Sequence, residues 1–266
     1  MRYRIEKDQL GERQVPAEAY YGIETLRGKE NFEITKRGIY RQLIKAIAIV
    51  KKSAAKANID AGNIDEKIGK AIMLACDEIL NGRFHGQFIT DVVQGGSGAG
   101  MNMNANEVIA NRANEMKGYE KGSYTLIKPI EDVNLNQKTS TVIPICGKIA
   151  SIRLVKKLLT ELKKLYNAFL DKANEAKAKG SQCEEQFKSM AASIQRCYKK
   201  IDLAINDLLP IHLEKELLNS EDPNIVKFCK KWVFYIGKYT GDGFFIAKDS
   251  SDTFQDVEAL DNLSSN

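Results

Sequence analysis

The chain has 266 residues, and its content of 43% hydrophobic and 28% charged residues excludes a disordered chain and allows a sizeable core. Its net charge of +5 comes without a helix-turn-helix, zinc-finger or RNA-binding pattern, and its lysines are spread along helical faces, so we expect no nucleic-acid partner. No apolar run approaches the ~18 residues that a membrane helix needs, and residues 1–14 lack an apolar signal core. The sequence therefore predicts a cytoplasmic protein without a membrane partner.

The cysteines and histidines limit the chemistry that the chain can perform. Five cysteines form no Cys-X-X-Cys pair, a pattern that favours reduced thiols over a disulfide framework. Two histidines are too few for a histidine-rich metal centre, and we expect no bound metal. These residues are Cys76, Cys146, Cys183, Cys197, Cys229, His85 and His212.

Helical periodicity begins at Arg41, after about 40 residues of turn signals and short apolar pieces. Residues 63–82 and 101–118 repeat the pattern, and each segment closes on a glycine that can end a helix. Residues 119–144 contain two prolines and predict a loop.

The second half of the sequence predicts long helices. After Pro144 an apolar residue recurs at three- and four-residue steps, which predicts a helix of ~48 Å from Gly147 to Lys179. Such a helix needs partner helices against its apolar stripe. A second helix should end before Pro210, and a third should carry Pro223 in its first turn. The expected class is mainly α, with domains at residues 1–143 and 144–266.

The segment "QGGSGAGMNMNAN" places a glycine turn at the start of a helix rich in asparagine. Backbone N–H groups at a helix N-terminus, together with side-chain amides, suit the binding of a carboxylate. One helix cannot aim every amide at one ligand, so we favour a structural role for Asn104, Asn106 and Asn111.

Three segments together resemble the aspartases of the aspartase/fumarase superfamily. They are "RIEKDQLGERQVPAEAYYGIETLRGKENFEIT", "QFITDVVQGGSGAGMNMNANEVIANRA" and "DVNLNQKTSTVIPICGKIA". The resemblance is strong from Arg4 to about Ala150 and weaker beyond. It implies an aspartase/fumarase-like N-terminal domain followed by part of a long-helix bundle, and no organic cofactor.

The resemblance also implies where a dicarboxylate substrate would bind, and the sequence departs from the family there. The family has Thr-Ser where this chain has Ala99-Gly100, and Ser-Thr-Asn where it has Lys138-Thr139-Ser140, so only Thr139 is retained. We regard the binding residues as vestigial; by family position they are Gly96, Ala99, Gly100, Asn104, Lys138, Thr139 and Ser140.

Lys138 allows two interpretations. Its ammonium group either attracts a carboxylate ligand or pairs with Glu131 or Asp132, and we favour the internal pair because a charge in a closed site needs a partner.

Two further catalytic segments of the family have no counterpart. The Thr-His pair that follows the first long helix in the family is missing, and the sequence stops before the family's Gly-Ser-Ser loop, which carries the catalytic serine. Ser264 and Ser265 lack the Pro, Lys and Asn that follow that serine, so neither is a candidate base. Loss of one oxyanion donor alone costs ~3 kcal/mol of transition-state stabilisation, so we expect no catalytic residue and no lyase activity from this chain alone.

Three functions stay open. The favoured one is an interaction or regulatory subunit, either in a homo-oligomer or in a hetero-oligomer with a full-length aspartase. The second is a working L-aspartate ammonia-lyase or a related dicarboxylate lyase, with relocated catalytic groups. The third is a non-catalytic binder of aspartate or fumarate.

Overall fold

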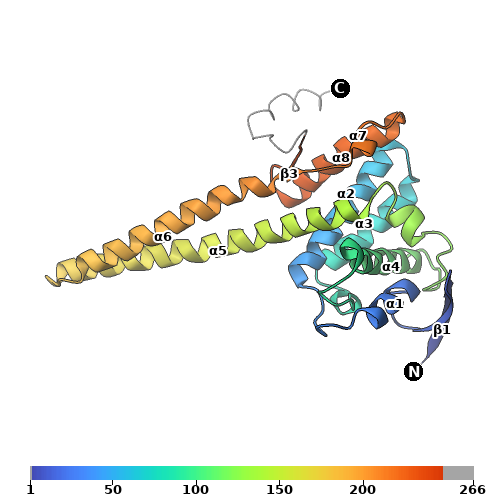
Figure 1. Ribbon diagram of the computed structural model, residues 1–266, viewed down its shortest axis with the longest axis horizontal. Coiled ribbons are helices and arrows are strands. Elements are labelled where there is room, and N and C mark those ends of the chain that lie inside the picture. Colours follow the sequence, from blue (N-terminus) through green and yellow to red (C-terminus); the bar gives the residue numbers. More distant parts are fainter. Residues whose placement is uncertain (1, 248–266) are drawn as a thin grey trace. The chain divides into compact units, whose positions relative to one another are not determined.

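Helix α2 (Arg41–Ala61) is the centre of the first of two units in the computed structural model, which describes residues 2–247. It packs against α3 (Glu66–Leu80) and against α8 (Pro223–Thr240), which is distant in sequence (Figure 1). Asp65 caps the start of α3 by accepting hydrogen bonds from two backbone N–H groups of the first turn. Residues 2–147 and 211–247 belong to this unit.

Helix α4 (Ala99–Glu115) packs against α1 (Ile23–Asn31), α3 and the π-helical turn η3 (Pro129–Val133). The turns η1 (His85–Gln87) and η2 (Gly96–Gly98) precede α4. Strands β1 (Tyr3–Asp8) and β2 (Gly11–Pro16) form an antiparallel hairpin, and β3 (Pro210–Ile211) and β4 (Phe245–Ile246) are short. The short helix α7 (Lys215–Leu218) contacts α8. The prediction of a mainly α fold is confirmed.

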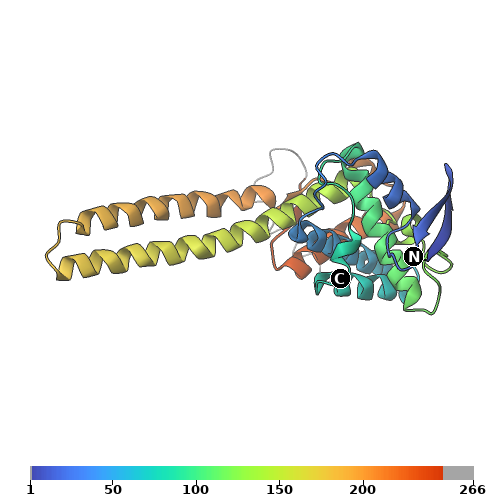
Figure 2. The same cartoon turned by 90° about the horizontal axis from the view of Figure 1, so that it is seen from below.

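The second unit, described over residues 148–210, is a helical hairpin. Helix α5 (Thr139–Ala178) begins in the first unit and continues into the second, where α6 (Glu184–Ala204) runs alongside it (Figures 1 and 2). The rings of Phe169 and Phe187 lie 6.4 Å apart between the two helices. The turn η4 (Asn206–Leu208) follows α6.

The prediction that the long helix starts after Pro144 is wrong, because α5 already begins at Thr139 and contains this proline. The backbone N–H groups of Thr141 and Val142 donate to the carbonyl of Lys138 and start the helix. Pro144 lies in the second turn, where its missing N–H costs a single hydrogen bond close to the helix end. Residues 139–144 therefore form a helix start rather than a loop.

Residues 211–247 belong to the first unit, whereas the sequence predicts them in a second domain at residues 144–266. The reason is the apolar face of α8, where Phe228 and Trp232 are fully buried and their rings stack with centroids 5.3 Å apart. The indole N–H of Trp232 donates to the carbonyl of Val50 in α2 at 3.1 Å. Within the described residues, no helix is both long and apolar enough to cross a membrane.

We predict that Trp232→Ala destabilises the first unit by about 3–5 kcal/mol, because it empties a fully buried site between α8 and α2. Urea unfolding followed by circular dichroism measures the loss. The matched control is Phe234→Ala on the exposed face of the same helix, which should cost less than about 1 kcal/mol. Equal losses for the two variants would contradict the central role of this packing.

Candidate functional site

The glycine turn before α4 and the start of α5 lie next to each other in the first unit. A Cβ atom added to Gly98 would lie 3.2 Å from the side chain of Ile143, and Asn102 Nδ2 donates to Thr139 Oγ1 at 3.1 Å. The structure thus brings the glycine turn and the first turn of α4 next to the start of α5, through Gly98 and Asn102.

The glycine turn forms one wall of a pocket of about 240 Å³. Gly96 and Gly98 adopt positive φ values of 57° and 87°, which a residue with a Cβ atom rarely adopts. A Cβ atom on Gly95 would lie 2.7 Å from the ring of Phe32, so this glycine accommodates the chain's own aromatic side chain. The lining residues are Gly28, Phe32, Thr90, Asp91, Gln94, Gly95, Gly96, Ala99 and Gly100.

The side chain of Gln94 lies at the start of α4. Its Oε1 atom accepts a hydrogen bond from the backbone N–H of Met101 at 2.7 Å, while its Nε2 donates to the carbonyl of Asp91 at 2.8 Å. A Cβ atom on Gly100 would lie 3.3 Å from the same Oε1 atom. A neutral amide of the chain therefore serves a helix N–H group that an anion would otherwise bind.

Asp91 gives this pocket a fixed negative charge. Burial alone would raise the pKa of Asp91, but hydrogen bonds from Val93, Thr35 and Lys36 outweigh it and lower the pKa to about 2. The carboxylate is therefore ionised at neutral pH. A dicarboxylate in the pocket would be repelled by it.

Lys138 pairs with two carboxylates, which are those of Glu214 and Glu216. Hydrogen bonds to these two groups raise the pKa of Lys138 to about 12. The expected pair with Glu131 or Asp132 is wrong: the carboxylate of Asp132 instead accepts the backbone N–H of Lys128 at 2.7 Å.

Ser140 binds the same carboxylate as Lys138. Its hydroxyl donates to Glu214 Oε1 at 2.7 Å, and the pairing with Lys138 together with this bond lowers the pKa of Glu214. Of the three residues Lys138–Ser140 that the resemblance assigns to substrate binding, Lys138 and Ser140 thus hold a side chain of the same chain.

A buried polar cluster connects α2, α4 and α5. Lys51 Nζ donates to Asn134 Oδ1 at 2.8 Å, and Asn102 Nδ2 donates to the same oxygen at 3.0 Å and to Thr139. The side chain of Lys51 is fully buried, and this desolvation lowers the pKa of Lys51 to about 7. Sequence reasoning missed this lysine, although the apolar periodicity of its helix includes position 51.

Asn104 has a structural environment. It accepts the backbone N–H of Ile89 and donates to the carbonyl of Gln87, both at 2.9 Å, and so holds the segment that leads to the glycine turn. Asn111 similarly donates to the carbonyl of Tyr20 at 2.8 Å. These contacts agree with the favoured structural role of the two amides, while substrate contact at Asn104 stays a prediction.

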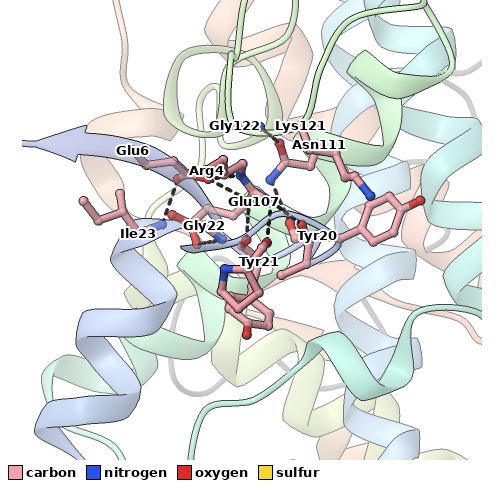
Figure 3. A network of polar contacts seen from close by, with 12 residues as sticks. Arg4, Glu6, Tyr20, Tyr21, Gly22, Ile23, Glu107, Asn111, Lys121 and Gly122 are labelled. Atoms are coloured by element: carbon pink, nitrogen blue, oxygen red, sulfur yellow. Dashed lines mark hydrogen bonds and ion pairs between the residues drawn. The ribbon is translucent and has the colours of Figure 1, made fainter. Parts of the chain in front are cut away.

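A second polar network fixes α1 beside α4 (Figure 3). Arg4 donates to four backbone carbonyls, those of Pro16, Ala17, Ala19 and Tyr21.

The buried carboxylate of Glu107 accepts the backbone N–H groups of Gly22, Glu24 and Thr25 at the start of α1. This framework holds α1, which contributes Gly28 to the pocket.

Two further sequence-based predictions concern a metal site and the serines near residue 264. The described residues contain no group of three or more His, Cys, Asp or Glu side chains that could hold a metal ion. Ser264 and Ser265 lie outside the described residues.

Comparisons with known proteins place these features in a class of helical lyases. A model of the lyase family matches residues 11–178. An aspartate ammonia-lyase of Bacillus subtilis (strain 168) is 51% identical over 173 residues, which are 65% of this chain and 36% of the relative. Another, from Bacillus sp, is 36% identical over 277 residues, covering 98% of this chain and 58% of the relative.

Solved structures agree. The native form of a fumarate lyase:delta crystallin from Brucella melitensis matches with a TM-score of 0.85 and 30% identity, over 100% of this chain and 67% of that one. The chain belongs to the aspartase/fumarase family of lyases. It spans 36% and 58% of the length of the two ammonia-lyases.

We predict that Lys51→Met removes a pH dependence of stability. The lysine pKa is near 10.4 in the unfolded chain and about 7 when folded, so between these values the unfolded state binds the extra proton. Relative to that of Lys51→Met, the free energy of unfolding of the parent chain should therefore rise by about 2 kcal/mol from roughly pH 7 to 9. Urea unfolding at the two pH values tests this.

Lys51→Met lacks the contribution of the lysine, because methionine does not titrate, so the difference between the two chains isolates Lys51. Lys67→Met, which changes an exposed lysine of α3, is the control and should keep that contribution. An equal pH dependence in Lys51→Met and the parent chain would contradict the lowered pKa of Lys51.

Proposed function

We propose that this chain is a cytoplasmic, non-catalytic member of its family that acts as an interaction or regulatory subunit of an aspartase-type assembly. The observation that supports this proposal most directly is a row of exposed leucines on α5, separate from the buried apolar face of the same helix. Leu154, Leu158 and Leu165 are 52%, 48% and 46% exposed and fall on one face of the helix.

The hairpin cannot cover this stripe itself. Its inner stripe is different, and within it Ile152, Leu159 and Ala173 are buried. A helix that is apolar on two faces needs a second neighbour, because exposed leucines in a row are a cost in water. Matching helices of a second copy, or of a full-length aspartase, are suited to this face.

The site supports the non-catalytic part of the proposal. Ala99 and Gly100 have no side-chain hydrogen-bond donors, Gln94 fills the adjoining space, and Glu214 engages Lys138 and Ser140. The turn between α5 and α6 reads "KGSQC" and contains no Thr-His pair. Proton abstraction next to a carboxylate needs strong stabilisation of negative charge, and these residues provide little of it.

One observation favours an alternative, in which the chain itself converts L-aspartate to fumarate and ammonia. That observation is the 51% identity to an aspartate ammonia-lyase over 173 residues. The same test separates the two proposals.

We expect the purified chain to release no fumarate from L-aspartate, as measured by ultraviolet absorbance, because its site lacks the required donors. Adding the chain to a full-length aspartase should change the rate or the cooperativity of that enzyme. Activity of the chain alone would support the alternative. No effect on the enzyme would contradict a regulatory role.

We also expect light scattering to show an oligomer, with a mass at least twice the 29.8 kDa of one chain. Leu154→Glu with Leu158→Glu should reduce this mass to that of a monomer, because two charges would be buried in the interface. The control places the same charges on the opposite face, as Thr160→Glu with Asn167→Glu, and should stay assembled. A monomeric parent chain contradicts self-assembly, and failure to co-elute with a full-length aspartase contradicts mixed assembly.

A further inference from the structure

The pocket beside the glycine turn has an open rim and a closed inner end. Gly96 and Ala99 are exposed at its rim, whereas Thr90 and Asp91 are only 2% and 5% exposed. The Cγ2 atom of Thr90 lies 3.8 Å from the position that a Cβ atom on Gly100 would take, so this side chain faces the first turn of α4. A small molecule that enters at the rim would therefore meet Thr90 at the inner end.

Three of the residues that line the pocket have polar side chains, and two of these side chains are engaged by other groups of the chain. The carboxylate of Asp91 accepts four hydrogen bonds, two at each oxygen, from Thr35, Lys36 and Val93. The amide of Gln94 accepts from one backbone N–H group and donates to one backbone carbonyl. A ligand would have to compete with these contacts to bind either side chain.

Thr90 has the third polar side chain. Within the described residues, its buried hydroxyl oxygen has no hydrogen-bond partner. Such a hydroxyl is unfavourable, because folding removes it from water without giving it another partner. The same hydroxyl can donate one hydrogen bond and accept another. Thr90 is therefore the lining side chain with which a ligand can form a hydrogen bond at no cost to the contacts of the chain.

The other walls of the pocket define the charge and size of a ligand. Among the described residues that line it, none is a Lys, Arg or His, and the ionised Asp91 repels anions. A cation lacks a direct partner, because both oxygens of Asp91 are already engaged. The ring of Phe32 and the methyl group of Ala99 make the walls partly apolar. Since an apolar cavity of about 150 Å³ holds benzene, a pocket of about 240 Å³ can hold one substituted ring.

We propose that this pocket binds a small uncharged molecule with one aromatic ring and one hydroxyl group, with the hydroxyl bound to Thr90 and the ring against Phe32. This ligand class differs from the dicarboxylate that the family resemblance implies for the glycine turn. The inference goes beyond the proposed function, and the pocket contains none of the exposed leucines of α5, so the two proposals can fail independently.

The experiment titrates the full chain with three para-fluorinated ligands at neutral pH and follows binding by fluorine NMR. The ligands are 4-fluorophenol, 4-fluorotoluene, which replaces the hydroxyl by a methyl group, and the anion 4-fluorobenzoate. We expect 4-fluorophenol to bind about two- to tenfold more tightly than 4-fluorotoluene, which is the net effect of one hydrogen bond. We expect no binding of 4-fluorobenzoate, because its charge meets that of Asp91.

Thr90→Val locates the hydrogen bond, because it keeps the shape of the side chain and removes the hydroxyl. Its affinity for 4-fluorophenol should fall to that for 4-fluorotoluene, and its affinity for 4-fluorotoluene should not fall. The variant should be at least as stable as the parent chain, since the lost hydroxyl has no partner among the described residues. The matched control is Thr160→Val, which removes an exposed hydroxyl of α5 and should bind like the parent chain.

Three results would overturn the proposal: equal affinities of the parent chain for 4-fluorophenol and 4-fluorotoluene, comparable binding of 4-fluorobenzoate, or unchanged binding of 4-fluorophenol by Thr90→Val. A measurement on the parent chain covers the case in which this variant does not fold. There 4-fluorophenol should slow amide hydrogen exchange in residues 90–100, whereas 4-fluorobenzoate should not. Equal exchange with the two ligands would contradict binding in this pocket.

Discussion

The fold depends on the enclosure of α2 between α3 and α8. Trp232 of α8 is buried against α2, so residues 223–240 belong to the first unit although α5 and α6 precede them in the sequence. The segment before α8 must then lie on the same unit, and the burial of Ile211 fixes its path. The contact between Glu214 and Lys138 follows from this packing. A core requirement in α2 thus determines what occupies the start of α5.

Apolar periodicity located most helices correctly, because burying one face of a helix imposes its repeat on the sequence. The helix stops were also visible: Gly82 and Gly118 both adopt the positive φ that ends a helix. Pro144 misled the prediction because a proline disrupts a helix interior, whereas near a helix start it removes only one hydrogen bond. The position of α8 was beyond sequence reasoning, since its apolar face suits several partners.

The candidate site was only partly predictable. The family resemblance points to the two segments at residues 96–100 and 138–140, and contacts of Gly98 with Ile143 and of Asn102 with Thr139 join their surroundings in the structure. No sequence pattern indicates the roles of Gln94 and Glu214, because these roles arise from tertiary contacts. Ser140 and Glu214, for example, are separated by 74 positions in the sequence. Lys51 did have a signal: it repeats the spacing of buried Ile44 and Ile47 and so had to point inward.

The side chains of Gln94 and Glu214 each match the charge of their neighbours, as a bound ligand would have to do. The N–H groups of a helix start need an acceptor whether or not a ligand is present. At α4 the ionised carboxylate of Asp91 is already close, so the neutral amide of Gln94 is a better acceptor than a second anion. Beside the start of α5, whose first N–H groups donate to the carbonyl of Lys138, the carboxylate of Glu214 pairs with the Lys138 ammonium and accepts from the Ser140 hydroxyl. A neutral amide thus lies beside the residue that holds the fixed negative charge, Asp91, and a carboxylate lies beside the ammonium of Lys138.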